Sequence, residues 1–330
     1  MANRRAVVWN VKGVRPEKIA CPDFDLSLTL HSGQVFHWRQ CGDGFVGTID
    51  ELPVYVEQRG DLLEVTASSR RGFKEHRQDV PATLRRYFAL DHPLSKICAS
   101  FPRDDDMRIA VEFCRGLRVI RQPAWECLAT FITSSMKQVA HIRQMSRALR
   151  ERYGKSKTIV GETVYTFPSV QRVAQLSEAE LRECALGYRA KNLLATAKRI
   201  ASGEADIEAW RALSDDELRA RLCTLPGVGA KVANCVMLFA YERLRAFPID
   251  VWIERVLKEK YFLRKRNVTA KQLRDFCANY FGAHGGYAQQ YLFHHARMTR
   301  PRRKAVQRRG AGAKLSQQAK CGTVPATGDA

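Results

Sequence analysis

The chain has 330 residues, of which 45% are hydrophobic and 27% charged, so it can form a folded core and is not a largely disordered protein. Lys and Arg number 55 against 34 Asp and Glu, a net charge of +21 that favours a polyanionic partner, either nucleic acid or an anionic membrane surface. No uninterrupted apolar run approaches the ~18 residues that a membrane-spanning helix needs.

The first predicted elements are strands, and they favour a small antiparallel sheet. Leu26, Leu28 and Leu30 alternate with polar residues, which predicts a strand. Turn residues such as Gly42–Gly44 and Arg59–Asp61 separate further strand-like runs at 35–38, 45–49, 54–56 and 62–65. We therefore predict an N-terminal α+β domain over residues 1–103.

From about residue 82 the apolar period becomes helical. One predicted helix carries Leu84, Tyr87 and Phe88 on one face, and the next carries Ile109, Phe113 and Cys114. Further predicted helices begin at Cys127 or cover 193–200, 215–222, 232–241 and 251–261. The sequence thus predicts an all-α region over 104–300.

Residues 301–330 form a basic segment of low complexity that we predict to be disordered. Its charge run has three interpretations: a solvated tail, a non-specific DNA tether or a nuclear address. The stretch from Arg300 onward has a net charge of +7, which leaves +14 on residues 1–299. The basic character therefore belongs to the predicted folded part as well.

The segment Leu225–Gly229, with the sequence L-P-G-V-G, is predicted to be a tight turn between two helices. Gly227 and Gly229 permit positive φ and a close approach of the backbone. The free N–H groups at the start of the second helix suit a phosphate, so the segment is typical of a helix-hairpin-helix that binds DNA. The alternative is a plain helical hairpin.

Two residues near this turn are candidate catalytic groups. Lys231 lies in the first turn of the second helix, where the macrodipole disfavours a cation. Its side chain either extends to solvent or acts as an amine nucleophile. Asp250 is predicted to cap the helix that begins at Val251, and a cap in apolar surroundings is also a fixed carboxylate. A loop that folds back would bring Asp250 into one cleft with Lys231.

L-P-G-V-G-A-K followed by P-I-D resembles the helix-hairpin-helix DNA glycosylases with lyase activity, and most of all the 8-oxoguanine DNA glycosylases. The resemblance extends over about residues 24–293. It rests on four further stretches: S-G-Q-V-F-H-W-R-Q at 32–40, R-Y-F-A-L-D at 86–91, R-Q-P-A-W-E-C-L at 121–128 and L-G-Y-R-A at 186–190. It implies an α+β fold, with a small antiparallel sheet domain similar to TATA-binding protein before an all-α glycosylase region.

The resemblance also implies roles for individual residues. Lys231 is expected to attack C1′ of the damaged nucleotide, and Asp250 to assist base departure and proton transfer. The flipped base is expected to lie in a pocket of Gly33, Cys235, Gln289 and Phe293. The Gly33 carbonyl would accept from N7–H, Gln289 would read the Watson–Crick edge, and Phe293 with Cys235 would sandwich the ring.

Other residues are expected to contact the duplex. Tyr188 and Arg189 would fill it and hold the orphaned cytosine. Relatives carry S-S-N-N-N and a following arginine where this chain has Met136 and His141, and a histidine where it has Trp252. These departures predict a weaker preference for cytosine opposite the lesion and the loss of one phosphate contact.

The expected function is therefore excision of 8-oxoguanine from double-stranded DNA, with strand cleavage by β-elimination after a lysine Schiff base. The alternatives are a monofunctional glycosylase for another damaged base and a non-catalytic helix-hairpin-helix DNA-binding protein. No cofactor and no metal are expected, because ten cysteines include no C-x-x-C pair and only Cys277 and Cys321 follow Asp250. We expect a monomer without membrane contact. It would be intracellular, in the cytoplasm or nucleoid of a prokaryote or the nucleus of a eukaryote.

Overall fold

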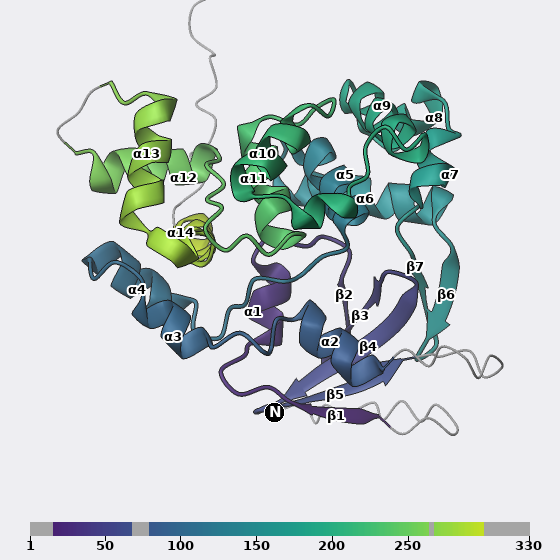
Figure 1. Cartoon of the computed structure of the whole chain (residues 1–330). Helices are drawn as coiled ribbons and strands as arrows, with labels where there is room; N and C mark the ends of the chain where they lie inside the picture. The colour runs from purple at the N-terminus through teal and green to yellow at the C-terminus, as the bar shows by residue number, and fades with distance from the viewer. Residues whose placement is uncertain (1–15, 68–78, 264–266, 300–330) are drawn as a thin grey trace, which may run out of the picture. The chain divides into compact units, whose positions relative to one another are not determined.

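A five-stranded antiparallel sheet forms the N-terminal part of the computed structural model, which describes residues 16–67, 79–263 and 267–299 (Figure 1). Its strands have the spatial order β1-β5-β4-β3-β2. Their bounds are β1 (Glu17–Ala20), β2 (Arg39–Cys41), β3 (Gly44–Ile49), β4 (Leu52–Arg59) and β5 (Leu62–Ala67). The predicted small antiparallel sheet is confirmed.

Helices make up most of the chain beyond the sheet. The first are α1 (Leu26–His31), which precedes β2, α2 (Val80–Tyr87), α3 (Leu94–Ala99), α4 (Asp105–Phe113), α5 (Ala124–Ser134), α6 (Val139–Tyr153), α7 (Val170–Ala174) and α8 (Glu178–Arg182). The others are α9 (Arg189–Ala201), α10 (Asp215–Cys223), α11 (Ala230–Phe239), α12 (Val251–Val256) with a π-helical continuation Leu257–Tyr261, α13 (Ala270–Tyr280) and α14 (Gly285–Thr299). The predicted α+β architecture is confirmed.

Four local predictions were wrong. Residues 35–38, predicted as a strand, form a loop before β2, because Val35 and Phe36 are both buried, one in each hydrophobic cluster. Leu26–Leu30 is helical, because the Asp25 carboxylate accepts from the Leu28 N–H at 2.7 Å and caps α1. The region predicted as all-α contains a hairpin of β6 (Ser156–Ile159) and β7 (Glu162–Tyr165), which packs on the outer face of β3 and β4. In α4, Ile109 and Phe113 are exposed, because the buried face is formed by Met107, Ala110 and the cap residue Cys114.

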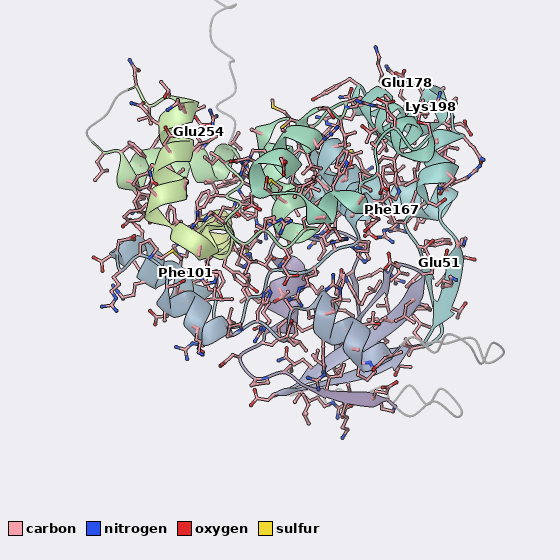
Figure 2. All side chains as sticks on the ribbon, in the orientation of Figure 1. Glu51, Phe101, Phe167, Glu178, Lys198 and Glu254 are labelled. Atoms are coloured by element: carbon pink, nitrogen blue, oxygen red, sulfur yellow. The ribbon has the colours of Figure 1, made fainter. Side chains whose placement is uncertain are left out.

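Two large hydrophobic clusters fill most of the described part of the chain, beside the small one under the β6–β7 hairpin, and each contains a residue from a segment that otherwise belongs to the other. The sheet cluster includes Val54, Leu63 and Leu84 but also Ile120, which lies far along the sequence. The helical cluster includes Phe36 from the loop before β2. Figure 2 labels Phe101 and Phe167, which both belong to the helical part. The ring centroid of Phe101 is 5.7 Å from that of Tyr291, and the ring centroid of Phe167 is 6.4 Å from that of Trp125.

The buried side chain of Gln34 joins the loop after α1 to the segment before α5. Its Nε2 donates to the carbonyl of Arg118 at 2.8 Å, and its Oε1 accepts from the N–H of Ile120 at 2.7 Å. Gln122 in turn donates to the backbone carbonyl of Gln34 and, through its own N–H, to the carbonyl of Phe239 at the end of α11. A chain of hydrogen bonds therefore links Gln34, the residue after Gly33, to the end of α11.

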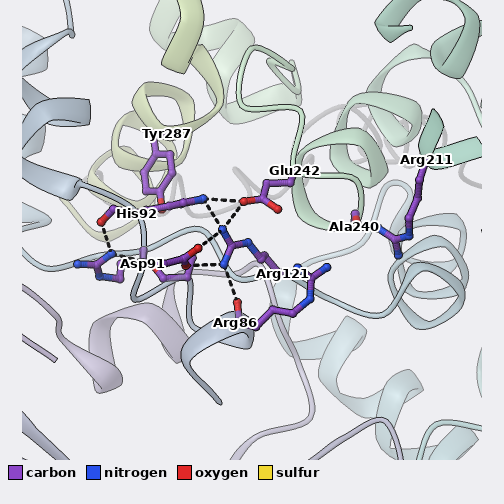
Figure 3. Close-up of polar contacts among 10 residues, drawn as sticks. Arg86, Asp91, His92, Arg121, Arg211, Ala240, Glu242 and Tyr287 are labelled. Carbon is purple, nitrogen blue, oxygen red and sulfur yellow. Dashed lines mark hydrogen bonds and ion pairs between the residues drawn. The ribbon is translucent and has the colours of Figure 1, made fainter. Parts of the chain in front are cut away.

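A polar network fixes the loop between α11 and α12 (Figure 3). Glu242 accepts from Arg121 and lies 2.8 Å from Nε2 of His92, whose Nδ1 lies 2.8 Å from the hydroxyl of Tyr287. Arg121 also pairs with Asp91. The hydrogen bonds from His92 and Arg121 lower the pKa of Glu242 to about 2. The loop that ends at the α12 cap is thus tied to the N-terminal part and to α14.

The described residues up to Met298 form one compact unit. The prediction of a disordered tail at 301–330 lies outside the described residues. Within the described ranges, no helix has the length and apolar character that a bilayer span requires.

We predict that Gln34→Met lowers the free energy of unfolding by about 2–4 kcal/mol. The variant keeps side-chain volume but leaves the Arg118 carbonyl and the Ile120 N–H buried without partners, each at about 1–3 kcal/mol. Urea denaturation measures the effect, and Gln40→Met, at an exposed position, is the control. Equal midpoints for the two variants would contradict the role of Gln34.

The Glu242 network predicts a pH-dependent stability. Since the folded-state pKa is lowered, the carboxylate contributes stability that is complete above about pH 4.5 and is lost as the pH falls toward 2. The difference in melting temperature between the native chain and Glu242→Gln should therefore shrink between pH 5 and pH 3. The exposed-pair variant Glu151→Gln should differ little from the native chain across this range. A constant difference for Glu242→Gln would argue against this account.

Candidate active site

The predicted helix-hairpin-helix is formed by α10, the turn at 224–229 and α11. Gly227 has φ +81°, and a Cβ there would lie 2.9 Å from Cβ of Asn192 on α9, so this turn requires glycine. Gly229 has extended backbone and is the N-cap of α11 without a side-chain cap, so N–H groups of the first turn remain available for an anion. Of the two glycines, only Gly227 has positive φ.

Lys231 lies in the first turn of α11, as predicted, and its side chain is partly buried. The amine Nζ is 5.2 Å from the ring centroid of Phe131 on α5. It also acts on the buried thiol of Cys235, one helical turn along α11. Burial raises the pKa of this thiol, whereas the charge and hydrogen bond of Lys231 lower it. Lys231 thus has apolar and thiol neighbours on its inner side.

Asp250 is the N-cap of α12, which confirms the predicted cap. Its Oδ1 accepts from the N–H groups of Trp252 at 3.0 Å and Ile253 at 2.9 Å. Burial raises the pKa of the Asp250 carboxyl, and the Ile253 N–H and the charge of Lys231 oppose the rise. The loop does bring Asp250 into the electrostatic range of Lys231. A carboxylate with a raised pKa is suited to accept and return a proton.

The structure brings Gly33 and Phe293 together, as the predicted base pocket requires. Gly33 has φ +91°, and a Cβ built on it would come within 3.1 Å of Cε1 of Phe293. Gln289, one turn before Phe293 on α14, is buried, and its Oε1 has no hydrogen-bond partner. The fourth predicted pocket residue, Cys235, interacts with Lys231.

The residues predicted to contact the duplex, apart from the hairpin glycines, come from the start of α9 and from residues 136–141 before and within α6. Tyr188 is 60% exposed, and its ring is 4.3 Å from Cζ of Arg189. Arg189 is buried, and its guanidinium donates to the carbonyl of Ser135, with Nε at 2.8 Å. Met136 follows with φ +57° and is 91% exposed. His141, on the first turns of α6, is exposed. Arg189 therefore holds the loop that presents Met136.

Sequence reasoning missed two features of this region. The helix α9 supports the hairpin turn, since Thr196 donates to the carbonyl of Pro226 at 3.1 Å and Arg199 to that of Thr224 at 2.7 Å. The second is Arg297 on α14, which contacts Gly33 and Phe293. The spacing of four residues from Gln289 to Phe293 and again to Arg297 is the signal that could have identified it. Among the described residues, no cluster of His, Cys, Asp and Glu is arranged to hold a metal ion.

Comparison with known protein families gives two matches. Residues 18–128 match the family model described as "8-oxoguanine DNA glycosylase, N-terminal domain". Residues 129–280 match "HhH-GPD superfamily base excision DNA repair protein".

Individual relatives cover most of the chain. A "Probable N-glycosylase/DNA lyase" of Methanothermobacter thermautotrophicus is 28% identical over 85% of this chain and 96% of its own. The solved structure of MBOgg1 in complex with a low affinity DNA ligand has a TM-score of 0.78 and 31% identity, and covers 86% of this chain and 98% of that one. The Clostridium acetobutylicum 8-oxoguanine glycosylase/lyase, in complex with dsDNA containing cytosine opposite to 8-oxoG, has a TM-score of 0.76 and 30% identity. The match covers 86% of this chain and 97% of that one.

Proposed function

The chain belongs to the 8-oxoguanine DNA glycosylases of the HhH-GPD superfamily, and from this membership we propose how its own residues carry out the reaction. It is an N-glycosylase and DNA lyase that excises 8-oxoguanine in base-excision repair. The proposal concerns the nucleophile, the proton carrier and the pocket. The observation that carries it is the placement of a helix-N-terminal lysine amine within electrostatic range of a partly buried helix-capping carboxylate.

Lys231 is the nucleophile in this proposal. Its neutral amine forms a bond to C1′ of the flipped nucleotide, and the bond from C1′ to N9 breaks with its electron pair going to the base. Opening of the sugar ring converts the adduct to a Schiff base. Loss of a proton from C2′ then expels the 3′ phosphate, which cleaves the strand by β-elimination. A monofunctional glycosylase would activate water and would not need this amine.

Asp250 moves the protons in this scheme. The nitrogen of Lys231 must lose a proton before it attacks, and the departing base must gain one. The backbone N–H groups of Trp252 and Ile253 hold Oδ1 of Asp250 in place. The raised pKa makes the carboxylate a stronger base than an exposed aspartate.

The pocket and the duplex contacts follow from the same membership. The target nucleotide leaves the duplex to reach Lys231. Gly33, Gln289, Phe293 and Cys235 would hold the base, and the unpaired Oε1 of Gln289 is free to accept from its Watson–Crick edge. Tyr188 and Met136, both exposed, would enter the space that the nucleotide leaves. We further propose that the enzyme acts as a monomer on chromosomal DNA, in a nucleoid or a nucleus.

We predict that Lys231→Gln abolishes base release and strand cleavage while DNA binding persists. Borohydride, which reduces the Schiff base, should link the native chain covalently to a duplex containing 8-oxoguanine and should leave the variant unlinked. Lys198→Gln, an exposed position on α9 labelled in Figure 2, is the matched control and should be linked as the native chain is. Full base release by Lys231→Gln would refute the nucleophile assignment and favour a water-activating glycosylase. If the native chain showed neither base release nor strand cleavage, a non-catalytic DNA-binding protein would be favoured.

We predict weak discrimination of the base opposite the lesion. Met136 offers no hydrogen-bond donor, His141 stands where relatives have arginine, and the guanidinium of Arg189 is bonded to Ser135. A missing bidentate contact costs about 1–3 kcal/mol of discrimination, roughly five- to 150-fold in rate. Single-turnover excision from four duplexes that differ only in the opposite base measures the preference, and His141→Arg should increase it for cytosine. A thousandfold preference for cytosine in the native chain would contradict the prediction.

A further inference from the structure

One face of α14 carries three side chains with different chemistry toward the loop that contains Gly33. Gln289, Phe293 and Arg297 are spaced four residues apart, so they lie in one row. A Cβ on Gly33 would collide with Nη1 of Arg297 and nearly touch the ring of Phe293. The guanidinium of Arg297 therefore lies against Gly33, at the pocket proposed for the base.

The guanidinium of Arg297 is only partly paired. Its Nη2 donates to the carbonyl of His31 and lies 3.3 Å from Nδ1 of His294. Burial lowers the pKa of His294 to about 4, so this ring is neutral and its Nδ1 can accept. Cζ of Arg297 is 5.4 Å from the ring centroid of Phe293. The other terminal nitrogen, Nη1, is buried and has no hydrogen-bond partner.

The same guanidinium lies within the electrostatic range of the proposed proton carrier. Burial lowers the pKa of Arg297, Arg143 on α6 lowers it further, and Asp250 opposes both. Arg297 thus connects the Gly33 and Phe293 side of the site to Asp250.

Unpaired buried polar atoms are costly, and two of those in the described part of the chain belong to this row. They are the acceptor Oε1 of Gln289 and the donor Nη1 of Arg297. The others are Nε atoms of arginines whose Nη atoms are bonded, namely Arg118, Arg121, Arg150 and Arg243, and Nε of Arg243 also lies 3.2 Å from Oδ1 of Asp215 in an ion pair. Each unpaired atom at the pocket costs free energy that a ligand of complementary pattern would recover.

An oxidised purine has that complementary pattern. The Watson–Crick edge of 8-oxoguanine carries N1–H and an amino group, which match the acceptor Oε1 of Gln289. Its opposite edge carries the C8 carbonyl beside N7–H. If N7–H faces the carbonyl of Gly33, the C8 oxygen comes next to the guanidinium that lies against Gly33. Undamaged guanine has C–H at this position and would leave Nη1 buried and unpaired.

We propose that Arg297 is a specificity-determining residue that donates its Nη1–H to the C8 carbonyl oxygen of the flipped 8-oxoguanine. This inference rests on the proposed function and names the group that reads the oxidised carbon. Selectivity then has two parts, a hydrogen bond gained with the lesion and a buried charge-bearing donor left unpaired with guanine.

The test uses the full chain with Arg297→Met, which keeps an extended apolar side chain over Phe293 and removes the donors. Single-turnover excision of 8-oxoguanine should fall at least about tenfold, since a hydrogen bond to a charged group is lost. Cleavage of a preformed abasic site, which contains no base, should stay within about twofold. Arg274→Met, an exposed position on α13, removes one charge and should change neither rate by more than about twofold.

A binding measurement separates base reading from a purely structural role and does not depend on catalysis. Duplexes with a 2′-fluorine on the target nucleotide resist base release, so affinities for 8-oxoguanine and guanine can be compared. We expect Arg297→Met to reduce the ratio of these affinities about tenfold, whatever the outcome of borohydride trapping. Equal losses with both bases, a loss of abasic cleavage matching that of excision, or faster excision would overturn the proposal. Faster excision would indicate that Arg297 only occupies the empty pocket.

Discussion

A single buried amide decides where the parts of this site meet. Gln34 follows Gly33 directly, and its side chain pairs with the backbone at Arg118 and Ile120. Through Gln122 the same segment reaches the end of α11, the helix that carries Lys231. Because no water competes for these groups, the pairing is sensitive to distance and angle. The glycine that would face the base and the proposed nucleophile are therefore held in one frame, although they are almost 200 residues apart in sequence.

Two further helices, α9 and α14, position the remaining site residues. The helix α9 supports the hairpin turn through Thr196 and Arg199, and Arg189 at its start holds the loop of Met136. The helix α14 supplies the row from Gln289 to Arg297, and Gln290 fastens it to the carbonyl of Ser32. In the proposed function, the residues that would contact the duplex and the residues that would hold the base thus depend on separate helices.

Local sequence signals predicted what local physics determines. The L-P-G-V-G turn, the cap at Asp250 and the strands of the first sheet were predictable because their hydrogen bonds lie within a few residues. Leu26–Leu30 was not, because alternation over five residues fits either structure and the deciding contact is the Asp25 cap. The β6–β7 hairpin owes its stability to Val46 and Tyr55 of the first sheet. Arg297 follows Phe293 by four residues, which places it on the same face of α14, but its contact with Gly33 depends on how α14 packs against the loop after α1.

The exchange of Phe36 and Ile120 between the two hydrophobic clusters has a consequence for folding. Phe36 directly follows Val35 of the sheet cluster, and Ile120 directly follows Val119 of the helical cluster, so packing of either cluster also positions part of the other. Local opening of one half would expose apolar surface in both, which raises the cost of partial unfolding. We therefore expect one cooperative transition in calorimetry, and we expect either half, produced alone, to expose apolar surface and aggregate. Substitutions in the two parts must therefore be compatible with each other where the parts exchange side chains.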